Sequence, residues 1–211
     1  MPRIPLPTLE TMTPEQRRAY DEIVAGPRQR VVGPLGAALH QPELARVWAK
    51  FGEYLRFGTT VAPRWRELAI LVTSRRWNSQ VEWHIHAEAA LRAGLPQSIV
   101  DAIRHAEPPT FEDPTDALVY EYARVMQMTG QVPDDLYAKA LEQFQAVGVV
   151  ELTAVIGYYT LVSMTLNAHD IPVGDDVEPP LRPVNGGVAF TGLTEIPAQI
   201  SGQPTAMSGQ R

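Results

Sequence analysis

The feature that most constrains the fold is a long, almost uninterrupted apolar stretch at residues 147–168. It approaches the roughly 20 residues that a helix needs to cross a bilayer. Glu151, Asn167 and His169 interrupt or flank it, however, and no basic cluster marks a cytoplasmic end. A helix that is apolar on nearly every side also suits the centre of a helical bundle or of an oligomer. We therefore predict a buried helix here rather than a membrane span.

Most of the preceding chain carries the three-to-four-residue apolar spacing of helices. Residues 27–41, which are rich in Gly and Pro, are predicted to form a loop. No alternating apolar pattern bounded by hairpin turns predicts a strand. The sequence therefore predicts an all-α protein, a helical bundle with a single domain over residues 1–172. The other predicted helices cover residues 13–25, 42–57, 63–76, 79–93, 96–105, 114–129 and 134–144.

From residue 173 onward the chain changes character, because Gly, Pro, Ser, Thr and Gln dominate. A segment of this composition cannot build a core of its own. We expect residues 173–211 to form an extended tail. Its isolated apolar side chains are predicted to anchor on a neighbouring subunit, and they are Val188, Phe190, Leu193 and Ile196.

The 211 residues include no cysteine. This count excludes disulfides, thiolate metal sites and every cysteine-based peroxidase or transferase mechanism. The formal net charge of −6 argues against nucleic acid as a partner, since phosphates select for basic surfaces. The first residues are punctuated by prolines and lack the apolar region of a signal peptide, so we expect a cytoplasmic protein.

Glu67 is the first candidate for chemistry. It shares a helical face with Ile70 and Leu71, so its carboxylate is predicted to point along an apolar ridge. Burial raises the pKa of such a carboxyl group toward a range useful for acid–base catalysis. The alternative is a structural glutamate near a helix N-terminus, paired with Arg64 or Arg66.

A second candidate group lies one helix later. Ser79, Glu82 and His86 are spaced three and four residues apart and share one helical face, whereas His84 points to nearly the opposite side. Histidine exchanges protons near neutral pH, and a carboxylate one turn away can orient its ring. The alternative is a core histidine that makes only a structural contact with Glu82.

Glu82 and His86 also have the i, i+4 spacing of two metal ligands. A third ligand would have to come from His40, His105 or His169, which are scattered along the chain. The second histidine of a His-Glu-x-x-His motif is missing, so we predict no metal site. The sequence contains no Gly-x-Ser-x-Gly elbow, phosphate loop or dinucleotide fingerprint either, and we predict no cofactor.

Three segments carry a family pattern: RELAILV at residues 66–72, EWHIHA at 82–87 and LRAGL at 91–95. Together they resemble the core of the carboxymuconolactone decarboxylase superfamily, which includes the AhpD-like alkylhydroperoxidases. The apolar run at 150–159 is similar to the C-terminal helix of many members, so the resemblance covers roughly residues 40–172, with its specific part within 64–95.

In the peroxidases of that superfamily a glutamate is followed, twelve, fifteen and nineteen residues later, by two cysteines and a histidine. Counted from Glu67, these positions hold Ser79, Glu82 and His86. A thiol peroxidase is therefore excluded, because Ser79 and Glu82 cannot cycle through a disulfide. The decarboxylase branch is similar to this chain in lacking the cysteine pair and in placing an aromatic residue, here Trp83, ahead of the histidine.

The resemblance implies a helical bundle that assembles as a trimer or hexamer, with its site near a subunit interface. It also implies a cofactor-free decarboxylation of a small lactone or enolisable acid. On this hypothesis His86 gives or takes the proton, Glu67 orients it or shuttles the proton, and Glu82 sets the local charge. The residues expected to contact the substrate are Trp83, Ser79, Arg75, Tyr158 and Tyr159, with Arg76 as a further candidate.

Several alternatives stay open from the sequence. The two tyrosines and Trp83 are also typical of core packing, and the arginines of solvent-facing helix charges. The same acid and base would serve another cofactor-free enolisation, such as isomerisation, lactone hydrolysis or carbon–carbon cleavage. A non-catalytic helical oligomer that binds a small molecule is the alternative from a different class.

Overall fold

A computed structural model describes residues 1–174, 176–182, 188–190 and 192–193. These residues form eight helices and no strand, which confirms the predicted all-α class. The helices are α1 (Pro14–Ala25), α2 (Pro34–Ala38), α3 (Pro42–Phe57), α4 (Pro63–Arg76), α5 (Gln80–Arg92), α6 (Gln97–His105), α7 (Pro114–Thr129) and α8 (Asp134–Ala168).

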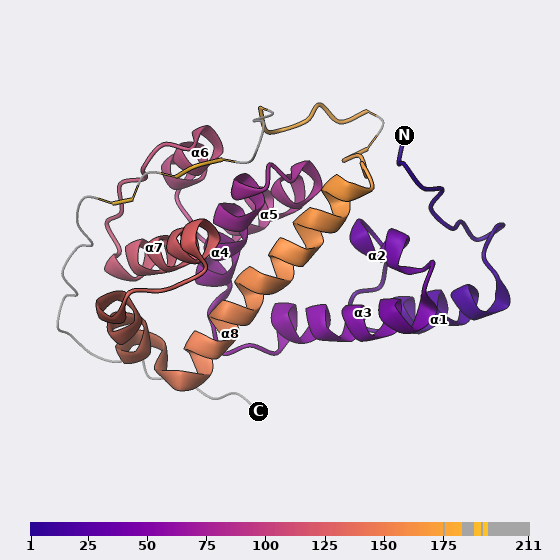
Figure 1. Cartoon of the computed structure of the whole chain (residues 1–211), viewed down its shortest axis with the longest axis horizontal. Coiled ribbons are helices and arrows are strands. Elements are labelled where there is room, and N and C mark those ends of the chain that lie inside the picture. The colour runs from indigo at the N-terminus through magenta and orange to yellow at the C-terminus, as the bar shows by residue number, and fades with distance from the viewer. Residues whose placement is uncertain (175, 183–187, 191, 194–211) are drawn as a thin grey trace.

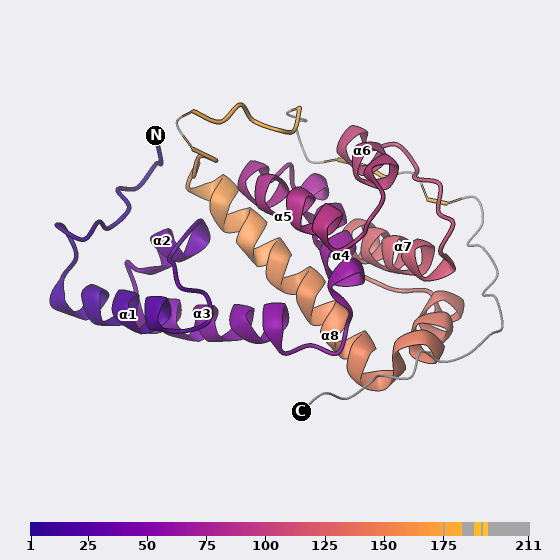
Figure 2. The same cartoon turned by 180° about the vertical axis from the view of Figure 1, so that it is seen from behind.

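Helix α8 runs diagonally through the molecule and separates two groups of helices (Figure 1). Helices α4 to α7 lie on one side of it, and α1 to α3 lie on the other, where α1 and α3 run side by side (Figure 2). Each group has its own apolar cluster, and α8 contributes to both, with Leu152 and Ile156 in one and Val155 and Val162 in the other. The helix therefore joins the two halves of the core.

Helix α4 has an uninterrupted buried run, because all its residues from Glu67 to Arg75 are buried. It packs against α5, α7 and α8. This explains why its sequence lacks a clean amphipathic stripe, since a helix covered on several sides needs no polar face. The site described below lies on α4 and on α5, its closest neighbour.

The helix boundaries follow local signals closely. Thr13 accepts a hydrogen bond from the backbone of Gln16, and the Gln16 side chain accepts one from the backbone of Thr13, which is a complete capping box. Pro63 occupies the first turn of α4, where its missing N–H costs nothing. The prediction for residues 27–41 was incomplete, since α2 lies within this loop. A five-residue helix is too short to show an apolar period.

The long apolar helix differs from the prediction in one respect. Helix α8 includes residues 134–144 as well, with a break at Gln145, whose φ of 55° and ψ of 178° are not helical. Its length and composition would suit a membrane span, but 56% of its most apolar window is buried in this chain. One face is exposed, and Val147, Val150, Leu161 and Met164 lie there.

The tail packs differently from the prediction. Val188 and Phe190 are buried in the core of their own chain, and Leu193 packs against it, so none of the three is placed on a neighbouring subunit. Phe190 meets Tyr120 edge-on at 6.3 Å between ring centroids. The Val188 amide donates to the carbonyl of Arg76. The fourth predicted anchor, Ile196, lies outside the described residues.

Candidate active site

The centre of the candidate site is the buried imidazole of His86, held between two carboxylates. Its Nδ1 lies 2.5 Å from Oε2 of Glu67, and its Nε2 lies 3.2 Å from Oε2 of Glu82. The three residues are 3%, 7% and 5% exposed. Both ring nitrogens therefore face an acceptor, an arrangement that suits the doubly protonated, cationic ring.

The local sequence accounts for this meeting. Helices α4 and α5 are joined by a tight connection in which Asn78 adopts a left-handed conformation with φ of 52°. The chain thereby turns back, so that Glu67 comes beside His86, nineteen residues later. On α5, Glu82 and His86 are one turn apart on the buried face, while His84 is exposed. The predicted facing of these residues is confirmed.

The charges reinforce one another. Burial alone lowers the pKa of His86, but the negative charge and hydrogen bond of Glu67, followed by those of Glu82, outweigh it and raise the pKa to about 9. Burial alone would raise the pKa of Glu67, yet the attraction to His86, and more weakly to Arg66 and Arg56, leaves it below its ordinary value. At neutral pH the pair is therefore ionised.

Two tyrosines of α8 complete the wall beside the imidazole. The ring of Tyr159 meets His86 edge-on, with 4.9 Å between centroids, and Tyr158 packs on Tyr159 in the same manner at 5.3 Å. Burial raises the pKa of both phenols, and the nearby charge of Glu82 adds to this. Both hydroxyls therefore stay protonated.

A narrow pocket opens onto this group. Its polar wall includes His86, Glu82 and both tyrosines, and its apolar wall includes Ile85 and Val162. Three arginines also line it: Arg28, Arg30 and Arg56. The pocket thus combines a buried imidazole and carboxylate with a concentration of positive charge, which suits a small anionic ligand.

The other three predicted contact residues lie elsewhere. Trp83 is fully buried in the main core, where the Arg104 guanidinium lies 5.9 Å from its ring centroid. Ser79 is buried at the N-terminus of α5. Arg75 is buried and donates to the side chain of Asn78 and to the carbonyl of Arg182. None of them lines the pocket.

The three arginines that line the pocket were not predicted from the sequence, which indicated Arg75 and Arg76 as carboxylate ligands instead. Arg28 and Arg30 lie in the Gly- and Pro-rich segment before α2, where no periodic pattern assigns a direction to a side chain. Arg56 lies in the last turn of α3, where a basic residue is also favoured by the helix dipole. The only available signal was positive charge clustered in a loop beside a helix end.

The structure supplies no third metal ligand beside Glu82 and His86 from the histidines considered for it, among the residues that it describes. Among the residues that the structure describes, no three His, Asp or Glu side chains form a ligand set. The ring of His40 bonds to the carbonyl of Pro5, and that of His105 bonds to the carbonyl of Asp101. Glu67, not a second histidine, is the group that approaches His86 opposite Glu82.

One segment of the chain matches a known protein family. Residues 42–118 match the model of the carboxymuconolactone decarboxylase family. This segment belongs to that family. It contains Glu67, Glu82 and His86, while the lining residues before α3 and on α8 fall outside it. The absence of cysteine from the whole chain agrees with a branch that lacks the peroxidase cysteines. No curated protein matches the chain in sequence.

Proposed function

We propose that this carboxymuconolactone decarboxylase family protein is a cofactor-free lyase that moves a proton on a small lactone or enolisable carboxylic acid. The observation that supports this most is the position of His86, buried between two carboxylates at the end of a pocket. A carboxylate oxygen faces each of its ring nitrogens, so the ring can be held doubly protonated as a proton donor.

In the proposed reaction, the carbon–carbon bond that joins the leaving carboxylate to the rest of the substrate breaks, and carbon dioxide departs. The electron pair passes onto the neighbouring carbonyl oxygen and forms an enolate. The carbon then takes a proton that originates on His86 and passes through Glu82, which lines the pocket. Glu67 keeps the imidazole cationic until that transfer, and water restores the proton afterwards.

The positive wall of the pocket supports the same chemistry. As carbon dioxide leaves, the negative charge moves from the carboxylate onto the neighbouring carbonyl oxygen, so fixed cations near that oxygen stabilise the transition state more than the substrate. Arg56 fits this role, since it lines the pocket and also attracts the charge of Glu67.

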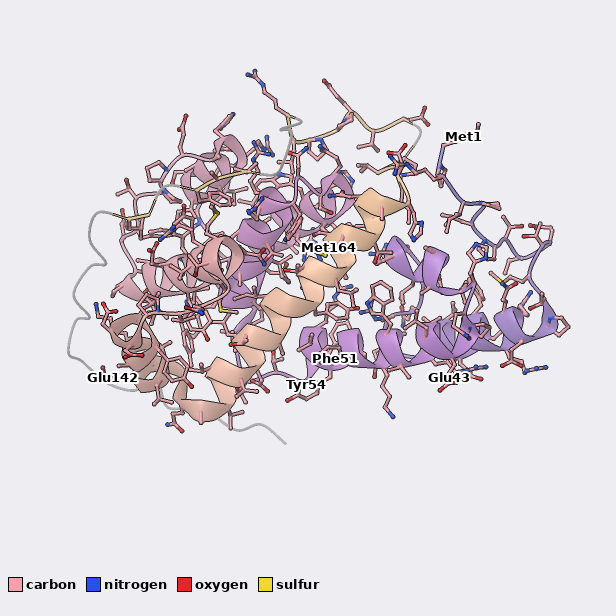
Figure 3. All side chains as sticks on the ribbon, in the orientation of Figure 1. Met1, Glu43, Phe51, Tyr54, Glu142 and Met164 are labelled. Atoms are coloured by element: carbon pink, nitrogen blue, oxygen red, sulfur yellow. The ribbon has the colours of Figure 1, made fainter. Side chains whose placement is uncertain are left out.

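We further propose that the chain works as a homo-oligomer, a trimer or hexamer, in the cytoplasm, with neither nucleic acid nor membrane as a partner. A seam on α8 supports this, with residues spaced alternately three and four apart: Val147, Val150, Ala154, Gly157, Leu161 and Met164. All of these residues are exposed except Ala154, which is half-buried. A Cβ at Gly157 would meet nothing within 4 Å, so another helix could approach closely there. Exposed apolar side chains on α3 extend the surface, and Figure 3 labels Phe51 and Tyr54 on it together with Met164 on α8.

The test is release of carbon dioxide from a carboxymuconolactone-type lactone acid by the purified protein. Wild type is expected to turn over, and His86→Ala is expected to lose roughly a hundredfold or more in kcat. His84→Ala is the matched control, because its side chain is exposed on the other face of α5. Circular dichroism and light scattering establish that each variant is folded and assembled. Lack of release by wild type would refute the decarboxylation, and full activity of His86→Ala would refute the role of His86.

A further inference from the structure

A glycine inside α3 makes room for two polar side chains of the site. A Cβ built on Gly52 would lie 2.0 Å from the hydroxyl of Tyr158 and 2.0 Å from Nη2 of Arg28. Gly52 is buried, and a glycine in a helix interior is destabilising relative to alanine. The position therefore has a packing reason to be glycine, since any side chain there would displace Tyr158 and Arg28.

The two groups beside Gly52 hold each other in place. Arg28 donates from Nη2 to the hydroxyl of Tyr158 at 3.1 Å, and from Nε to the carbonyl of Ala49 at 3.2 Å. The third nitrogen, Nη1, makes no hydrogen bond within the described part of the chain. Because the Tyr158 oxygen accepts from Arg28, its own proton is left to donate. Arg28 thus keeps Nη1, and Tyr158 keeps its hydroxyl proton, as donors for a ligand.

The charges around these donors are unbalanced. As far as the described residues go, no carboxylate lies within 4.0 Å of Arg28, Arg30 or Arg56. Among the residues lining the pocket, Glu82 is the one acidic side chain, and it already faces His86. A pocket with three such guanidinium groups attracts an anion.

We infer that Arg28 and Tyr158 bind a carboxylate of the substrate, and that Gly52 is the positioning residue that brings the two donors together. A carboxylate presents two acceptor oxygens in a plane, one for the guanidinium and one for the phenol. The inference rests on the proposed function and names the residues that select its substrate. The acid held here is one that stays on the product, because stabilising the leaving carboxylate would oppose its loss.

The pocket must widen to admit such a ligand. Its internal volume of about 30 Å³ holds only one or two water molecules. Arg30 and Val32 line it and are exposed, so their side chains can move outward without breaking the core. Arg28 and Tyr158, which are bonded to each other, stay as the fixed part of the wall.

The test is calorimetric binding of 5-oxotetrahydrofuran-2-carboxylate, a lactone acid, against its methyl ester, which has the same ring without the charge. Wild type is expected to bind the acid at least roughly tenfold more tightly than the ester. Arg28→Gln should weaken binding of the acid by roughly ten- to a hundredfold and abolish the preference for acid over ester. Tyr158→Phe and Gly52→Ala should each weaken it by about tenfold.

Two matched variants control for nonspecific effects. Arg17→Gln removes an exposed arginine far from the pocket, and Gly36→Ala adds a Cβ that meets only the Leu6 side chain, at an ordinary 3.6 Å. Both should bind the acid as wild type does. The inference is overturned if Arg28→Gln keeps wild-type affinity, if acid and ester bind equally, or if wild type binds no acid.

Binding needs no turnover, so the two proposals fail separately. A protein that prefers the acid through Arg28 but releases no carbon dioxide from any lactone acid contradicts the decarboxylase proposal alone. A protein that decarboxylates while Arg28→Gln retains its affinity contradicts the carboxylate site alone.

Discussion

Nδ1 of His86 lies 2.5 Å from Oε2 of Glu67, and the two side chains come from adjacent helices whose contacting faces are buried. Burying a charged carboxylate or a charged imidazole alone costs desolvation free energy. In the pair, the attraction between the opposite charges offsets part of that cost. The pair therefore couples folding to protonation, and the coupling can be measured.

Stability is expected to fall as pH rises from about 6.5 to 9. The pKa of His86 is raised from 6.5 to about 9 in the folded protein, so its contribution is fully present below 6.5 and is lost through 9. The loss is on the order of 3 kcal/mol in the free energy of unfolding. Urea unfolding at pH 6 and pH 9.5 measures it. His84→Gln should keep this pH dependence and His86→Gln should lose it, and an unchanged slope in His86→Gln would contradict the assignment.

Glu67 and Glu82 are expected to affect catalysis differently. Glu82→Gln removes the carboxylate that lines the pocket, so kcat should fall roughly a hundredfold or more. Glu67→Gln removes the strongest interaction that raises the pKa of His86, so the alkaline limb of the pH–rate profile should move to lower pH. Steady-state profiles between pH 5 and pH 10 separate the two effects. Identical profiles in both variants would show that the carboxylates share one role.

Glu151 is expected to stabilise the fold without acting on His86. Its Oε1 accepts from Tyr54 at 2.6 Å, and its Oε2 accepts from the backbone and hydroxyl of Thr60 at 2.7 and 2.6 Å. In Glu151→Gln the new amide NH2 group faces a hydrogen-bond donor of Tyr54 or Thr60. The free energy of unfolding, measured in urea, should therefore fall by about 1–3 kcal/mol. Glu142→Gln, at an exposed position of α8 labelled in Figure 3, is the control.

Acid denaturation gives a second measure of Glu151. Burial acts to raise its pKa, but the hydrogen bonds from Thr60 and Tyr54 outweigh this and lower it. Its contribution is therefore present above the ordinary carboxyl pKa and is lost as pH falls. Glu151→Gln should flatten the acid limb of the stability profile. A steep limb in that variant would assign acid sensitivity to other carboxylates.

The exposed seam of α8 is expected to hold the oligomer together. Leu161 and Val150 are 47% and 67% exposed in the single chain. Leu161→Glu or Val150→Glu would bury an unpaired charge in an interface, which is strongly unfavourable. Light scattering after size exclusion should then report the monomer mass. Leu91→Glu, at another exposed apolar position, should leave assembly intact, and a wild-type monomer would refute the seam as an interface.

The helices were predictable because their signals are local. Proline at the first turn, the Thr13 capping box and apolar spacing together predicted α3, α4 and α7 to the residue, and α1, α5 and α6 within one residue at each end. Helix α2 was missed, and α8 was predicted as two separate helices. What the sequence missed depends on contacts between distant segments. Tail residues Val188 and Phe190 pack into a core that the helices build. No local sequence pattern indicates where in that core a tail residue will pack.

The candidate site divides in the same way. Helical spacing put Glu82 and His86 on one face and marked Glu67 as a carboxylate on an apolar ridge, but only the structure brings Glu67 to His86. Which arginines face the pocket depends on how the loop before α2 folds over α8, so Arg28 was not foreseen while Arg75 was proposed. The reason for Gly52 becomes visible only once Tyr158, on a helix a hundred residues later, is seen against it.

The chemical groups and most of the charged wall of this pocket come from separate stretches of polypeptide. Glu67, Glu82 and His86 lie within the segment that matches the family, whereas Arg28 and Arg30 precede it. Exchanging the loop before α2 would therefore change the choice of ligand while leaving the proton-transfer apparatus untouched. The segment that would select the ligand can therefore be replaced separately from the segment that holds the carboxylates and the histidine, and grafting that loop is a direct route to a redesigned specificity.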